Sequence, residues 1–152
     1  MILVNPPFPE ERAFIAVLMS WFISQFLKLI RGGIKEKRLS LKWLFNTGGM
    51  PSSHSATVSC LATVTGLYYG LNSVLFLAVG IFSIVTMFDA AGVRRAVGKQ
   101  ARILNNMVDE IYETGEFKED RLKELLGHTP VEVFAGAFLG VIIGVVFCKL
   151  EI

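Results

Sequence analysis

The feature that most constrains this chain is a long stretch without charge. From Trp43 to Phe88 the sequence holds no Asp, Glu, Lys or Arg. Water-soluble domains rarely continue that far without a charged residue, whereas two membrane helices joined by a tight turn do so naturally. The hydrophobic fraction of 53% is also above that of a typical soluble domain. The sequence therefore predicts an integral membrane protein.

Four apolar runs are each long enough for a membrane helix, at the short end of the roughly 17–25 residues that a span needs. They cover residues 13–30, 53–69, 72–90 and 130–149. We therefore expect an all-α membrane protein, a bundle of about four transmembrane helices in a single domain over residues 1–152.

Two polar segments connect these helices. Residues 31–49 read as a basic loop, in which 39–45 is expected to lie at the membrane interface. Residues 99–127 form a polar, partly helical insertion, with a second short helix expected at 121–126. The first part of the insertion is predicted to be an amphipathic helix, because it carries apolar residues at helical spacing: Leu104, Met107, Val108 and Ile111. This helix could lie on the membrane surface or form a lid.

The positions of lysine and arginine predict the orientation in the membrane. Of the 15 such residues, only Arg12 and Lys149 fall on one side, which leaves 13 on the other. Because cytoplasmic loops carry the excess of positive charge, the side with 13 is expected to face the cytoplasm, with both termini outside. The acidic residues before the first apolar run also argue against a signal peptide. We expect an inner-membrane protein.

Composition excludes several other classes. The net charge of +2 gives little support for a nucleic-acid partner. Cys60 and Cys148 both lie inside apolar runs, so they are read as small packing residues and not as a disulfide or a metal site. No metal and no cofactor is expected.

The polar residues of the apolar region converge on one end of an up-down bundle. Lys28 lies near the end of the first helix, His54 opens the second, Asp89 ends the third, and His128 and Glu132 open the fourth. Helix N-termini and cations both bind anionic phosphate groups, and a pair of histidines can supply a nucleophile and a proton donor. The sequence therefore predicts a phosphate site, on the basic side of the membrane.

Three motifs carry a family resemblance. Residues 49–54, Gly-Met-Pro-Ser-Ser-His, resemble the proline-serine-glycine-histidine motif of the type 2 phosphatidic acid phosphatase superfamily. Residues 128–136 resemble its histidine motif, in which an acidic residue follows four positions later. Residues 89–95 and the glycine-rich last helix are similar to the small divergent branch of that superfamily, which is related to acid phosphatases and vanadium-dependent haloperoxidases.

The resemblance implies a metal-independent phosphatase that acts on a lipid-like phosphate monoester or pyrophosphate. It implies that His128 is the nucleophile and forms a phosphohistidine, that Glu132 orients it, and that His54 is the general acid. It also implies a set of phosphate ligands: Lys28, Lys35, Ser52, Ser53 and Arg94 or Arg95. This chain departs from the superfamily in having Ser53 for glycine, Glu132 for aspartate, and Lys35 where an arginine is usual.

Each of these residues also has a structural interpretation. Thr129-Pro130-Val131-Glu132 forms a capping box, which could be the whole role of Glu132 or could combine with orienting His128. Ser52 and Ser53 could be plain N-caps, and the two histidines could be interfacial. Asp89 is expected to pair with Arg94 or Arg95.

Two other functions therefore stay open beside the phosphatase. One is a non-catalytic binder or carrier of a lipid phosphate, and the other is a structural membrane subunit. The expected partners are the lipid substrate and membrane lipids. Gly136, Gly140 and Gly144 form a ridge of small residues that could join helices within the chain or make a homodimer.

Overall fold

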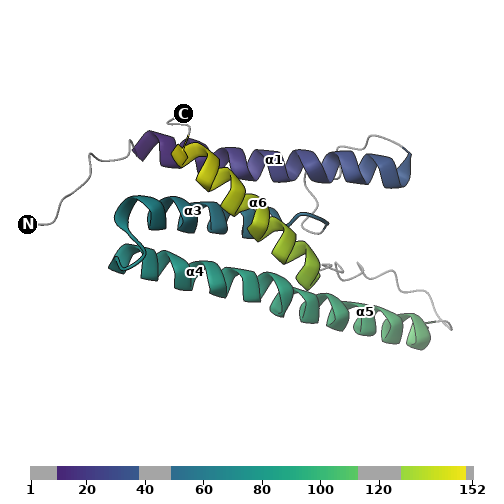
Figure 1. Cartoon of the computed structure of the whole chain (residues 1–152). Coiled ribbons are helices and arrows are strands. Elements are labelled where there is room, and N and C mark those ends of the chain that lie inside the picture. The colour runs from purple at the N-terminus through teal and green to yellow at the C-terminus, as the bar shows by residue number, and fades with distance from the viewer. Residues whose placement is uncertain (1–9, 38–48, 113–127, 150–152) are drawn as a thin grey trace, which may run out of the picture.

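The computed structural model describes residues 10–37, 49–112 and 128–149, and all regular structure within them is α-helical (Figure 1). The helices are α1 (Glu10–Glu36), α3 (Ser53–Tyr69), α4 (Val74–Ala91), α5 (Val93–Tyr112) and α6 (Pro130–Lys149). The bounds of α3 and α6 coincide with those expected from the sequence, and α4 differs by two residues at its start and one at its end.

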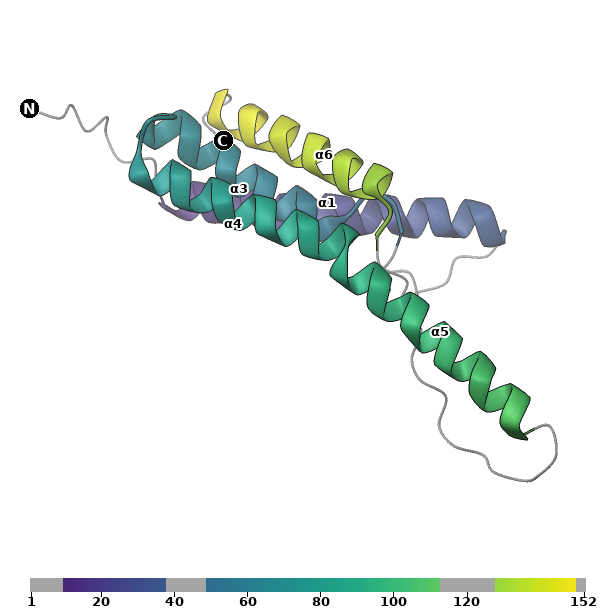
Figure 2. The ribbon, with the colours of Figure 1, turned by 90° about the horizontal axis from the view of Figure 1, so that it is seen from below.

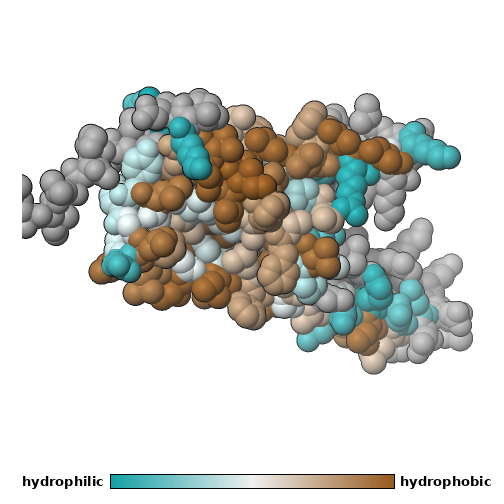
Figure 3. Space-filling model, in the orientation of Figure 1, coloured by the Kyte–Doolittle hydropathy of each residue, from teal (hydrophilic) through white to brown (hydrophobic). Residues whose placement is uncertain are grey.

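The surface of the bundle is apolar in the way that a membrane protein requires. Within the residues that the structure describes, three segments are long and apolar enough to span a membrane: Glu11–Ile34, Val74–Asp109 and Pro130–Lys149. Large apolar side chains on them are exposed, among them Phe14, Phe88 and Phe134. Figure 3 shows the apolar surface over the bundle, with hydrophilic residues gathered towards its ends. The expected all-α membrane fold with a bundle of about four helices is confirmed.

Helix α3 lies at the centre of this bundle and contacts α1, α4 and α6. Its residues suit that position because they are small: Ser55, Ala56 and Cys60 are fully buried. Cys60 belongs to an apolar cluster with Ala16 and other buried residues, and both cysteines are unbridged. This arrangement agrees with the interpretation of Cys60 as a packing residue.

The glycines of α6 let that helix cross α3 at close range. A Cβ atom added to Gly136 would overlap the backbone oxygen of Ser52, and one added to Gly140 would overlap that of Ala56. A Cβ atom on Gly144 would lie 2.9 Å from Cβ of Thr63. The glycine ridge therefore serves a contact within the chain and is covered by α3. A homodimer stays a prediction, but its interface would have to use another surface.

The topology brings one end of each helix to a common region. Gly70, with a φ of 84°, and Ser73, whose hydroxyl accepts from the backbone N–H of Phe76, form the tight turn between α3 and α4. Chain direction then alternates, so the start of α3, the end of α4 and the start of α6 lie at the same end of the bundle (Figures 1 and 2). The candidate site is at this end.

Two expected boundaries were wrong. Residues 31–36, which were assigned to the basic loop, continue α1 as helix to Glu36. The insertion was expected to begin at residue 99, but α5 begins at Val93, directly after Gly92 ends α4. The interfacial segment at 39–45 and the short helix at 121–126 lie outside the described residues. The expected helical spacing of Leu104 and Met107 does lie within α5.

Candidate active site

The two histidines of the chain come together at this end of the bundle. The centroids of the His54 and His128 rings are 6.4 Å apart, with the ring planes at 62°. His54 is the second residue of α3 and is exposed, whereas His128 precedes α6 and is buried. The backbone N–H of His128 donates to the backbone oxygen of Ala90 at 3.1 Å, which fixes it to the end of α4. Three helices therefore hold this pair.

Glu132 has two roles at the start of α6. Its Oε2 atom accepts a hydrogen bond from the backbone N–H of Thr129 at 2.9 Å, and the Thr129 hydroxyl accepts from the backbone N–H of Glu132 at 3.4 Å. This is the expected capping box. The same Oε2 atom lies 3.3 Å from Nδ1 of His128. The carboxylate therefore caps the helix and orients the imidazole at once.

Lys28 reaches the start of α3 from the side. It is 2% exposed, and its Nζ donates to Oγ of Ser53 at 3.2 Å. The carboxylate of Glu132 acts on this ammonium electrostatically. A buried lysine needs such polar and charged partners, because an isolated charge inside an apolar bundle is costly. Lys28 thus joins α1, α3 and α6 at one point.

Ser52 is the N-cap of α3, as its structural interpretation predicted. Its Oγ accepts from the backbone N–H of Ser55 at 3.4 Å and from the Ser55 hydroxyl at 3.0 Å. Its backbone N–H donates to the backbone oxygen of Glu132 at 3.0 Å, close to the contact of Gly136 with the Ser52 backbone. The start of α3 is thereby fixed against the first turns of α6.

The remaining candidate residues are less closely placed. Lys35 lies two turns beyond Lys28 on α1, about 10 Å along the helix axis at 1.5 Å per residue. Arg94 and Arg95 are in the first turn of α5, shortly after Ala90, and their side chains lie outside the described part of the structure. The expected pairing of Asp89 with either arginine is therefore not tested.

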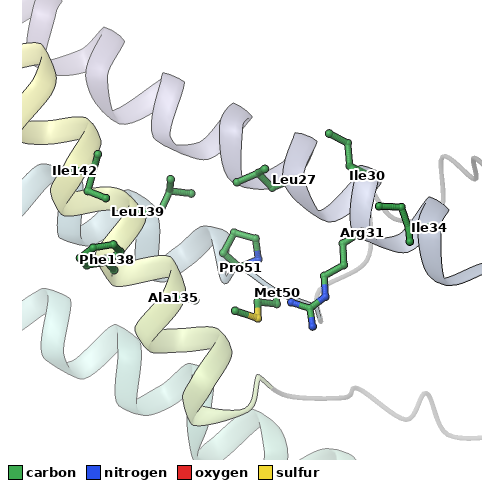
Figure 4. A pocket seen from close by; sticks show the side chains of 10 residues that line it. All are labelled: Leu27, Ile30, Arg31, Ile34, Met50, Pro51, Ala135, Phe138, Leu139 and Ile142. Carbon is green, nitrogen blue, oxygen red and sulfur yellow. The ribbon is translucent and has the colours of Figure 1, made fainter.

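An apolar pocket that the sequence did not reveal lies beside this site (Figure 4). It has a volume of about 550 Å³ and lies between α1 and α6, next to Met50 and Pro51. Arg31 is the one charged residue among the ten that line it. The sequence does place Leu27, Arg31 and Ile34 at helical spacing, which is the signal for this wall of the pocket. Because residues from 31 onwards were assigned to a loop, that spacing was not interpreted as part of a helix.

The arrangement suits the binding and transfer of a phosphoryl group. It supplies one imidazole held by a carboxylate, a second imidazole next to it, an ammonium group, and the N-terminus of a helix. Among the described residues, no group of three His, Cys, Asp or Glu side chains is placed to hold a metal ion. The described residues at this end of the bundle bring together nucleophiles, proton donors and hydrogen-bond donors.

Comparison with known proteins agrees with the resemblance in the motifs. The model of the Divergent PAP2 family, a name that refers to the type 2 phosphatidic acid phosphatases, matches residues 9–143. The uncharacterized membrane protein YuiD of Bacillus subtilis (strain 168) is 40% identical over 143 residues, which are 87% of this chain and 90% of that protein. No solved structure matches the chain. The family match extends from before α1 into α6 and includes both histidines, so the chain belongs to the Divergent PAP2 family.

Proposed function

We propose that this protein is a membrane phosphatase that hydrolyses a lipid-like phosphate monoester or pyrophosphate through a phosphohistidine intermediate. The observation that carries the proposal is the pair of imidazoles 6.4 Å apart, one of which has its Nδ1 atom 3.3 Å from a carboxylate. Reacting atoms in productive complexes lie about 3–3.5 Å apart. A phosphoryl group between the two rings can therefore meet both of them.

In this mechanism Glu132 keeps the proton of His128 on Nδ1, so that Nε2 carries the lone pair. Nε2 attacks phosphorus, the N–P bond forms, and the bond from phosphorus to the leaving oxygen breaks; this is the lipid oxygen in a monoester and the bridging oxygen of the inner phosphate in a diphosphate. His54 gives its proton to that leaving oxygen. It then takes a proton from a water molecule that attacks the phosphohistidine, which releases inorganic phosphate and restores both histidines.

The remaining polar groups would neutralise the phosphoryl oxygens. Lys28 stands at Ser53, and the backbone N–H of Ser53 belongs to the first turn of α3, where the helix offers no acceptor for it. Such N–H groups and the positive end of the helix dipole favour anions. The Ser52 hydroxyl, Lys35 and one of Arg94 and Arg95 complete the proposed set of ligands.

We place this site on the cytoplasmic side of an inner membrane, with both termini outside. The support is the excess of lysine and arginine in the segments that flank the site, 13 residues of 15. The substrate would then come from the inner leaflet.

A non-catalytic binder of lipid phosphates is the second candidate, and the capping box favours it. Since Glu132 already serves Thr129, its contact with His128 is explained without a reaction. A binder would keep Lys28 and the helix N-terminus for the anion but would need no nucleophile.

A phosphate-release screen on the purified protein separates the two functions. The substrates are polyprenyl phosphate, polyprenyl diphosphate, phosphatidate and phosphatidylglycerol phosphate, each tested with and without EDTA. The proposal predicts release from at least one lipid, unchanged by EDTA and absent in His128→Ala. Binding of these lipids without any release would favour the carrier.

A further inference from the structure

The pocket beside the site is largely apolar, and several residues that line it are close to the candidate catalytic groups along the chain. Its α6 wall is formed by Ala135, Leu139 and Ile142, and the same face of the helix leads back to Glu132, three residues before Ala135. Its floor is Met50 and Pro51, which directly precede the site serines. The groove therefore begins where the phosphate site ends.

The α1 wall gives the groove a single charge. Leu27, Ile30 and Ile34 line it with Arg31, and Arg31 is one helical turn from Lys28. In Figure 4 the guanidinium of Arg31 extends towards Met50, which precedes Pro51 and the site serines in the chain. No ion pair to Arg31 is found among the described residues. An arginine on an otherwise apolar wall is suited to an anionic group attached to an apolar chain.

We infer that the groove between α1 and α6 binds the hydrocarbon chain of the substrate and that Arg31 binds a second anionic group next to the phosphate that is removed. The inference rests on the proposed function and makes the preferred substrate a lipid diphosphate. The order of groups along such a lipid is chain, inner phosphate, outer phosphate. That order matches the order groove, Arg31, histidine pair.

The volume and shape of the groove agree with this assignment. About 550 Å³ lies within the range of about 300–1,000 Å³ typical of small-molecule sites. The lining on α6 extends over eight residues from Ala135 to Ile142, about 10 Å of helix. One hydrocarbon chain running from the site along the apolar groove fits these dimensions.

Matched substrates test the role of Arg31. Polyprenyl monophosphate and diphosphate of equal chain length are compared with the full chain reconstituted in lipid nanodiscs. Arg31→Gln should raise KM for the diphosphate about tenfold, equivalent to about 1.4 kcal/mol, and change KM for the monophosphate less than about twofold. Lys99→Gln on α5, an exposed cation away from the groove, is the control and should change neither. Equal effects of Arg31→Gln on both substrates, or none on either, would overturn the assignment.

Photocrosslinking tests the groove without any need for turnover. A lipid diphosphate with a diazirine in its chain should label peptides containing residues 27–34 and 135–142, in the parent protein and in His128→Ala alike. Ala135→Phe, which fills the groove, should remove most of this labelling, whereas Val141→Phe on the exposed face of α6 should not. Labelling spread over the exposed helices, or unchanged in Ala135→Phe, would refute the groove. Site-specific labelling with no phosphate release would instead reject only the phosphatase.

Discussion

A substitution at Glu132 can separate helix capping from the proposed catalytic role, because one carboxylate oxygen makes both contacts. Its Oε2 accepts from Thr129 N–H at 2.9 Å and lies 3.3 Å from Nδ1 of His128. Glu132→Gln keeps an acceptor for the cap, because glutamine also forms capping boxes. It removes the negative charge that, in the proposed mechanism, stabilises the His128 ring as Nε2 attacks phosphorus, and it weakens the electrostatic partner of Lys28. The substitution should therefore leave the fold intact and lower the rate.

The expected size follows from these contacts. A hydrogen bond to a charged group contributes about 1.5–3 kcal/mol, against about 0.5–1.5 kcal/mol for a neutral one. The loss of charge therefore removes about 1–2 kcal/mol of transition-state stabilisation, which is about 5–30-fold in rate. Glu132→Ala also loses the side-chain half of the capping box, and should destabilise the protein by about 1 kcal/mol in addition.

Two measurements on each variant decide the outcome. Phosphate release under single-turnover conditions gives the rate, and a thermal melt followed by circular dichroism gives stability. Glu132→Gln should lose rate and at most the stability that its charge supplies through Lys28, whereas Glu132→Ala should lose rate and about 1 kcal/mol more of stability from the cap. If Glu132→Gln lost stability and kept its specific activity, Glu132 would be a cap alone and the proposed orientation of His128 would be wrong.

Three further predictions address the leaving group, the helix crossing and the orientation. His54→Ala should lower the rate by about 10²–10⁴-fold for a lipid alkoxide leaving group. The loss should be far smaller for an aryl phosphate, whose leaving group needs no proton. Equal losses on both substrates would reject His54 as the general acid. Gly140→Ala should destabilise the bundle by about 1–3 kcal/mol because its Cβ would overlap the Ala56 oxygen, whereas Gly80→Ala, which has nothing within 4 Å, should not lower the melting temperature. With both native cysteines replaced, Ser40→Cys should be shielded from an impermeant thiol reagent in sealed cells, and labelling from outside would reverse the predicted orientation.

The helices could be predicted where the sequence carries both a pattern and a boundary signal. Thr129 and Glu132 mark the start of α6, and Ser52 and Gly70 bracket α3, so both sets of bounds coincide with the structure. The end of α1 could not be predicted in the same way. Its last turns carry Gly32, Gly33 and several charges, which read as a loop. A helix can continue past its apolar run, because glycines and charged residues do not break its backbone hydrogen bonds. Composition therefore marks where the apolar run ends, which need not be where the helix ends.

The approach of the two histidines could be anticipated from the sequence, but the contacts around them could not. Alternating chain direction was enough to bring His54 and His128 to the same end of the bundle. The bond from Lys28 to Ser53 depends on how α1 packs against α3, and the groove beside Arg31 depends on how α6 crosses the other helices. That crossing is set by three-dimensional contact of glycines with backbone, which spacing along one helix does not determine.

The most direct test of the account is to trap the intermediate on His128. The purified protein is mixed with a radiolabelled lipid phosphate that it hydrolyses, quenched in alkali, where phosphohistidine survives, and mapped by peptide mass spectrometry. The account predicts one acid-labile phosphate on His128, absent in His128→Ala and accumulating in variants that slow the attack of water. Hydrolysis of lipid phosphate by His128→Ala at the parent rate, or label on another residue, would contradict it.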